Sequence, residues 1–147
     1  MSTLAITRPV SASIGRCELS FSERVPIDLE RARSQHALNQ SALRGHGCRV
    51  VSLPAPDDLT EAVYVEDTAV ILDELAIITR PGVSSRRPEM LEIAASLSSL
   101  RRLANIEAPG TLDGGDVLRA KRTLFVGLGS RTNRAGAAAL AVLAEPL

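Results

Sequence analysis

The sequence is poor in aromatic residues, in lysine and in cysteine, and these scarcities exclude several classes of protein. Aromatic residues make up 2% of the 147 residues and Trp is absent, so a surface that stacks nucleic-acid bases is not expected. The 17 basic residues are dispersed and balanced by 17 acidic ones, which excludes a general attraction to nucleic acid or to an anionic membrane. The two cysteines, Cys17 and Cys48, form no CxxC motif and no disulfide framework, which fits a reducing cytoplasm.

Long apolar runs are missing as well. No run approaches the ~18 residues of a membrane-spanning helix, and residues 1–9 lack the pattern of a signal peptide. Hydrophobic residues nevertheless make up 45% of the chain, enough for a domain with a core of its own. We therefore expect a cytoplasmic protein that contacts neither membrane nor nucleic acid.

The most informative motif is GTLDGGD at residues 110–116. Two carboxylates, Asp113 and Asp116, flank a Gly-Gly pair that allows a tight turn and a close approach of a ligand. The cation best matched to paired carboxylate oxygens is a planar guanidinium. Taken alone, such a motif is more often a structural turn with an Asx-type cap. Other motifs of the chain are needed to favour a binding site over a turn.

Hydrophobic patterning predicts an α/β chain with an internal repeat. We expect strands at 4–7, 49–53, 68–72, 75–79, near 105–107, at 116–119 and 123–127, and helices at 28–44, 86–100 and 133–144. Asp67 and Asp116 then open corresponding strands, while Arg86 and Arg131 open corresponding helices. An arginine at a helix start is unfavourable for the helix dipole, which points to a functional reason for both arginines.

Five motifs in order resemble the dimethylarginine dimethylaminohydrolases, members of the guanidine-modifying pentein superfamily. They are YVED at 64–67, ITRPG at 78–82, SRR at 85–87, GTLDGGD at 110–116 and SRTN at 130–133. The resemblance implies a five-bladed α/β propeller, of which residues 1–147 form the N-terminal portion of a single domain, about two and two-thirds strand–strand–helix–strand repeats, with the C-terminal repeats absent. On this reading the chain is a truncated or split form with open sheet edges.

The resemblance also implies an activity, the hydrolysis of the guanidino C–N bond of methylated arginine to citrulline and dimethylamine. A cysteine thiolate attacks the guanidinium carbon and a histidine protonates the departing amine. Both residues belong to a part of the family sequence that this chain does not contain, so Cys17 and Cys48 are not expected to be nucleophiles. We expect the chain alone to be inactive, and no cofactor is implied.

The acidic residues are assigned to the guanidinium of the substrate. By resemblance, Asp113 is catalytic and contacts the reacting group, while Glu66 and Asp67 form the acidic pair that holds it. A Mg²⁺ or Ca²⁺ site is the alternative for these carboxylates. Neither EF-hand spacing nor a Walker pattern supports it, so no metal is expected.

The remaining assignments concern the amino-acid end of the substrate. Arg86 and Arg131 are expected to pair with its carboxylate, for which a bidentate guanidinium is suited. Glu61 stands where many relatives carry an aspartate that binds the amino group, and the longer side chain leaves amino-acid specificity open. Leu19 matches a lid residue whose backbone contacts substrate.

Other readings stay open. The chain is alternatively a non-catalytic guanidino-ligand-binding or scaffold fragment, or part of a related arginine deiminase or amidinotransferase. The expected partner is a small guanidino amino acid. A homo-oligomer or a complementing C-terminal half are further possible partners through the open edges.

Overall fold

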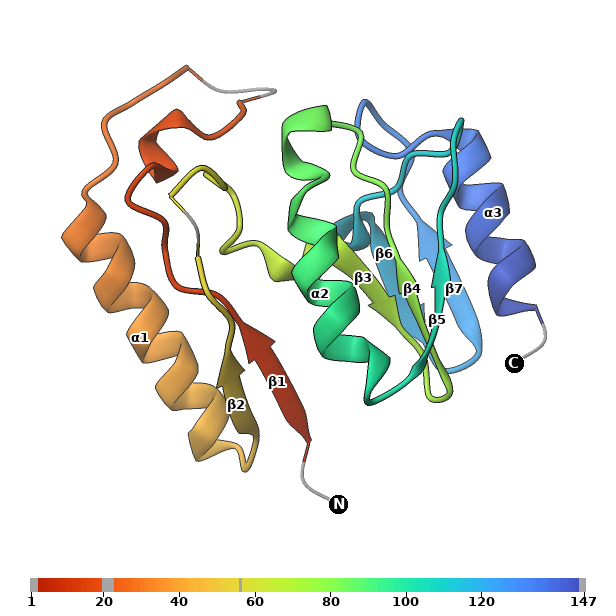
Figure 1. Cartoon of the computed structure of the whole chain (residues 1–147), viewed down its shortest axis with the longest axis horizontal. Coiled ribbons are helices and arrows are strands. Elements are labelled where there is room, and N and C mark those ends of the chain that lie inside the picture. Colours follow the sequence, from red (N-terminus) through yellow and green to blue (C-terminus); the bar gives the residue numbers. More distant parts are fainter. Residues whose placement is uncertain (1–2, 20–22, 56, 146–147) are drawn as a thin grey trace. The chain divides into compact units, whose positions relative to one another are not determined.

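The computed structural model describes residues 3–19, 23–55 and 57–145. The chain forms a mixed α/β fold in two compact units, Met1–Val65 and Glu66–Leu147, which are described separately (Figure 1). No helix within the described residues is long and apolar enough to cross a membrane.

The first unit is a strand–helix–strand motif. Strand β1 (Leu4–Thr7) pairs in parallel with β2 (Arg49–Ser52), and α1 (Leu29–Gly45) connects them. The side chain of Asp28 caps α1 by accepting the backbone N–H of Arg31 at 3.0 Å, and Gly47 follows the helix with a φ of 82°. The predicted strand at 4–7, the helix and its cap are confirmed, and β2 ends one residue earlier than expected.

The second unit repeats a strand–strand–helix order, visible in Figure 1. Its first part contains β3 (Ala69–Ile71), β4 (Leu75–Ile78), α2 (Glu89–Ser98) and β5 (Arg102–Asn105), and its second part contains β6 (Val117–Ala120), β7 (Thr123–Val126) and α3 (Arg134–Ala144). The pairs β3–β4 and β6–β7 are antiparallel hairpins, whereas β4–β5 is parallel. Strand β4 pairs with β3 on one edge and with β5 on the other. Among the described residues, the equivalent strand β7 pairs with β6 only. Both predicted hairpins are confirmed.

One hydrophobic core joins the two parts of this unit. All four residues of β4 are buried, as a central strand requires. Buried core residues are Val70, Leu72, Leu75, Ile77, Ile106, Leu112 and Leu140, with partly buried residues of β6, β7 and α3 packed against them. Each such side chain contributes roughly 1.5–3 kcal/mol when fully buried. The core therefore fixes the two hairpins relative to each other, and with them the loops at their ends.

The predicted starts of helix α2 and of strand β5 are wrong. Helix α2 begins at Glu89, because residues 84–86 form a separate 3-10 turn and Pro88 stands at the helix start, where its fixed φ is favourable. In α3 the N-cap is Asn133, whose side chain accepts the N–H of Gly136 at 2.7 Å. Neither Arg86 nor Arg131 therefore opens a helix, and the dipole argument for them does not hold.

The strand expected near 105–107 is also displaced. Strand β5 covers Arg102–Asn105, because its parallel register with β4 starts at the pair Leu75 and Arg102.

Candidate functional site

The candidate site lies at the ends of the two hairpins of the second unit. A 3-10 turn, Val65–Thr68, leads into β3, and a second one, Gly114–Asp116, leads into β6. The two turns are joined directly, because Oδ1 of Asp67 accepts the backbone N–H of Gly115 at 3.1 Å. Two acidic motifs far apart in the sequence thus form one structure.

The Gly-Gly pair is needed for this contact. A Cβ atom added to Gly115 would lie 2.5 Å from the carboxylate oxygen of Asp67 that its own N–H binds. A Cβ atom added to Gly114 would overlap the backbone carbonyl oxygen of Glu66. The absence of side chains here lets the two turns approach each other.

A buried arginine links Asp67 to α2. Nη1 of Arg86 lies 2.5 Å from Oδ2 of Asp67, while its Nε and Nη2 donate to the two carboxylate oxygens of Glu89 at 3.1 and 3.0 Å. The side chains of Arg86 and Glu89 are only 3% and 1% exposed. Burial alone lowers the pKa of Arg86, but the hydrogen bonds and charges of Glu89 and Asp67 outweigh it and raise the pKa. Arg86 is thus a permanent cation held between two carboxylates.

Asp113 lies beside this pair and is 4% exposed. Its Oδ1 accepts the N–H of Gly82 at 3.4 Å, and its Oδ2 lies 3.5 Å from Nη1 of Arg131. Burial, and then the charge of Asp67, raise the pKa of Asp113, against the lowering effect of the Gly82 N–H and the two arginines. The carboxyl group is thus easier to protonate than an ordinary aspartate.

Thr132 fixes the backbone next to Asp113. Its hydroxyl accepts the backbone N–H of Asp113 at 3.1 Å and donates to Oδ2 of Asp116 at 2.5 Å. The side chain is fully buried. The carboxylate of Asp116 is therefore hydrogen-bonded within the protein, and Thr132 links the SRTN motif to the GTLDGGD motif.

The structure brings four of the predicted site residues into one cluster. Asp67 pairs with Arg86 and Asp113 with Arg131, and the charges of Asp67 and Arg86 act on Asp113. We call these four residues and Glu89 the acidic cluster. Its three carboxylates and two guanidiniums give a net charge of −1 when all are ionised. Such a cluster favours a cationic ligand over an anionic one.

Three further predicted residues have other surroundings. Glu66 is exposed on the turn that also carries Asp67. Glu61 and Leu19 belong to the first unit, where Oε1 of Glu61 accepts the backbone N–H of Glu18 at 2.9 Å. This bond holds the residue next to Leu19, whose side chain is exposed.

Two residues of the site were not singled out from the sequence. Glu89 stands three residues after Arg86, and oppositely charged residues at this spacing often pair, so the sequence does carry a signal for it. Thr132 lies inside the SRTN motif, but its two partners are distant in sequence and nothing local indicates them.

Both cysteines lie in the first unit, whereas the acidic cluster lies in the second. Cys17 is buried against Val10 and Ile14, and Cys48 is half-buried, both in the first unit. In residues 3–19, 23–55 and 57–145, no three His, Cys, Asp or Glu side chains gather in a way that could hold a metal ion.

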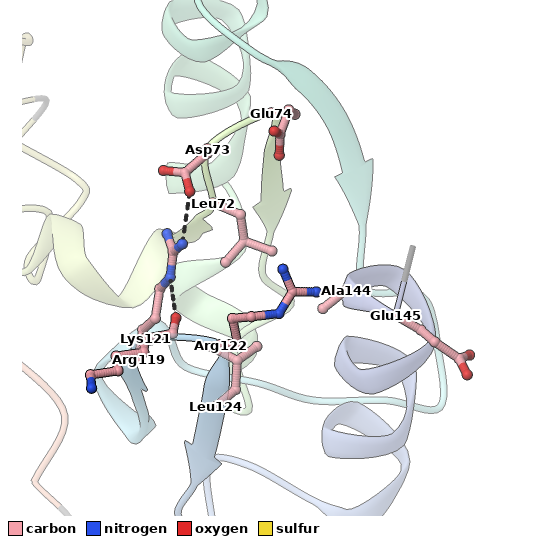
Figure 2. A pocket seen from close by; sticks show the side chains of 9 residues that line it. All are labelled: Leu72, Asp73, Glu74, Arg119, Lys121, Arg122, Leu124, Ala144 and Glu145. Carbon is pink, nitrogen blue, oxygen red and sulfur yellow. Dashed lines mark hydrogen bonds and ion pairs between the residues drawn. The ribbon is translucent and has the colours of Figure 1, made fainter. Parts of the chain in front are cut away.

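A separate pocket of about 390 Å³ lies at the opposite end of the hairpins (Figure 2). Its lining residues are Leu72, Asp73, Glu74, Arg119, Lys121, Arg122, Leu124, Ala144 and Glu145. Arg119 bridges the two hairpins there by pairing with Asp73 at 2.8 Å. The side chains are of mixed charge, so the pocket favours neither a cation nor an anion.

Comparison with known proteins gives consistent similarities. The N(G),N(G)-dimethylarginine dimethylaminohydrolase of Streptomyces coelicolor is 38% identical over 144 residues, which cover 97% of this chain and 56% of the relative. The solved structure of a DDAH mutant from Pseudomonas aeruginosa, complexed with citrulline, matches with a TM-score of 0.93 at 30% identity, over 99% of this chain and 58% of that one.

A more distant structure shares the fold alone. The N-terminal domain of a cyanobacterial arginine dihydrolase matches with a TM-score of 0.83 at 15% identity, over 95% of this chain and 54% of that one. No protein-family model matches the chain. The chain spans about half the length of the curated relatives it matches.

Proposed function

Because this chain belongs to the dimethylarginine dimethylaminohydrolase family, we propose that it supplies the guanidino-binding part of a hydrolase that converts dimethylarginine to citrulline and dimethylamine. The observation that carries the proposal is the acidic cluster. Its net negative charge and its buried Asp113 suit a planar cation that donates hydrogen bonds to carboxylates.

We propose roles for three acidic residues. Asp113 contacts the reacting guanidinium and is the catalytic carboxylate of this part of the site. Asp67 and the exposed Glu66 on the same turn hold the guanidinium from a second side. Burial and the charge of Asp67 raise the pKa of Asp113, and a bound cation would offset both effects, which supports the assignment of Asp113.

The two arginines differ in their surroundings, and we assign them different roles. Arg131 is partly exposed and its contact with Asp113 is long at 3.5 Å, so it can turn to a ligand carboxylate. Arg86 is buried between Asp67 and Glu89, which supports a role through Asp67 in place of a direct grip on the ligand. The assignment of Glu61 and Leu19 to the amino-acid end of a ligand rests on the family resemblance alone.

The proposed architecture is part of a five-bladed propeller. The repeated strand–strand–helix order of the second unit supports it, and so does the match over 57% of a family structure. We propose that residues 1–147 form the N-terminal portion of this domain. The cysteine nucleophile and the histidine would then come from a complementing half.

A non-catalytic guanidino-binding fragment is the second candidate. The match to about half of each relative supports it. The two candidates share the same ligand site and differ only in turnover.

Isothermal titration of the 147-residue chain with asymmetric dimethylarginine tests the ligand site. We expect saturable binding that Asp113→Asn abolishes and that Asp73→Asn leaves unchanged. Asp73 is a matched control, because it is an aspartate paired with an arginine at the opposite end of the hairpins. Equal loss in both variants, or no binding by a folded chain, would reject the proposal.

A further inference from the structure

We propose that Glu89 is a positioning residue of the acidic cluster: it fixes the Arg86 guanidinium against Asp67 and gives the cluster its net negative charge. The proposal rests on the guanidino-binding function proposed above and extends it to a residue outside the five motifs.

The geometry of α2 makes Glu89 a rigid anchor. Glu89 is the first residue of the helix, where a carboxylate is favoured by the helix dipole. Both of its oxygens bind Arg86, at 3.1 and 3.0 Å, and a bidentate pair fixes the plane of the guanidinium. Arg86 then presents Nη1 to Asp67.

The anchoring continues to the glycine turn. Asp67 uses one oxygen for Arg86 and the other for the N–H of Gly115. The order Glu89, Arg86, Asp67, Gly115 therefore connects the start of α2 to the loop before β6. Displacement of Glu89 would release Asp67 from one of these two supports.

Stability alone is a weak reason for such a pair. A buried ion pair is often no more stabilising than apolar residues of the same volume. An apolar pair would provide neither a fixed donor for Asp67 nor a compensating charge for Arg86. Without the Glu89 charge, two carboxylates and two guanidiniums remain, and the net charge of the acidic cluster becomes zero.

The first test needs no ligand. Asp113 is faced by the charges of Asp67, Arg86 and Arg131, and by the N–H of Gly82. Its pKa is measured by ¹³C NMR titration of the chain and of two variants. Glu89→Gln should lower the pKa of Asp113, because the charge of Arg86 is no longer offset. The double variant Arg86→Gln/Glu89→Gln removes both charges and should restore most of the original pKa.

The outcomes of this titration are exclusive. An unchanged Asp113 pKa in Glu89→Gln would overturn the proposal, and so would a shift that persists in the double variant. Asp73→Asn is the control, and it should not move the titration.

The second test separates charge from shape. Glu89→Gln should weaken asymmetric dimethylarginine about tenfold, whereas citrulline, whose ureido group is neutral, should change less than about threefold. Equal weakening of both ligands would indicate a merely structural role and overturn the proposal. If the unsubstituted chain binds neither ligand, the proposed function fails, and the Asp113 titration still decides the role of Glu89.

If Glu89→Gln does not fold, the double variant carries the test, because it leaves no buried charge unpaired. It should keep the Asp113 pKa but lose affinity for dimethylarginine, since Asp67 has lost its Arg86 support. Unchanged affinity in a folded double variant would contradict the positioning role.

Discussion

Oδ1 of Asp67 accepts the backbone N–H of Gly115 at 3.1 Å, although the two residues lie 48 positions apart in the sequence. The bond joins the turns that precede two equivalent hairpins. The shared hydrophobic core of the second unit holds those hairpins together, so the site loops rest on a rigid support.

Because the two turns approach each other closely, a methyl group added to Gly114 should destabilise the protein more than one added to an open position. Gly114→Ala should lower the free energy of unfolding by about 2 kcal/mol, because the added Cβ meets the carbonyl oxygen of Glu66. Gly129→Ala is the matched control, since a Cβ there has no atom within 4 Å. Urea denaturation followed by circular dichroism measures both. Similar values for the two variants would contradict the packing described here.

The raised pKa of Asp113 predicts a pH dependence of stability. The carboxyl group of Asp113 binds a proton more tightly in the folded than in the unfolded protein. Its contribution to the free energy of unfolding is therefore fully present below the unfolded pKa of 3.8 and is lost as pH rises through the folded pKa. Asp113→Asn has no carboxyl group that titrates here, so its stability does not fall for this reason. Its stability relative to the unsubstituted chain should therefore improve from about pH 4 to neutrality.

The control for this prediction has the opposite sign. The hydrogen bond and charge of Arg119 lower the pKa of Asp73, so its contribution is present above 3.8 and is lost as pH falls. Relative stability of Asp73→Asn should improve toward acidic pH. Parallel trends for the two variants in denaturation experiments would refute the assigned shifts.

The hairpin β6–β7 predicts self-association of the isolated chain. Leu118 and Phe125 lie opposite each other in register and are 65% and 57% exposed. Exposed apolar side chains beside an unpaired strand edge favour association. The chain should form oligomers at micromolar concentration, as measured by light scattering after gel filtration. Leu118→Lys/Phe125→Lys should reduce them, whereas Leu38→Lys on α1 should not. A monomer at all concentrations would speak against this.

The proposed roles of Asp113 and Arg131 predict different kinetic effects in a full-length relative carrying the equivalent changes. Asp113→Asn should reduce kcat strongly, since it removes a charge-assisted contact worth roughly 1.5–3 kcal/mol and the orientation it fixes. Arg131→Ala should mainly raise KM, because it contacts the distant carboxylate in ground and transition states alike. Steady-state kinetics that show the reverse pattern would mean that the roles are exchanged.

Local sequence signals predicted the elements whose partners are close in the chain. The hairpins around residues 73–74 and 121–122 and the capped helix after Asp28 follow from short-range apolar patterns and turn chemistry. The start of α2 differs from the predicted one, because residues 84–86 form a 3-10 turn and the helix begins only after Pro88.

The site was predicted as residues but not as contacts. The motifs indicate the acidic turns and the arginines, and the short spacing indicates the pair of Arg86 and Glu89. The contact of Arg86 with Asp67 and the hydrogen bond from Thr132 to Asp116 depend instead on how distant segments pack. Asp113 is buried and contacts Gly82, Arg131 and Thr132, which are distant in sequence, and no local pattern encodes these contacts.

The central claim is that the acidic cluster binds a guanidino cation. The most direct test is a ¹H–¹⁵N NMR titration of the chain with asymmetric dimethylarginine. The account predicts saturable shifts of the amides of Gly82, Gly115 and Arg131, with the turn at 73–74 unaffected. Shifts confined to the pocket of Figure 2, or an unchanged spectrum of a folded chain at saturating ligand, would contradict it.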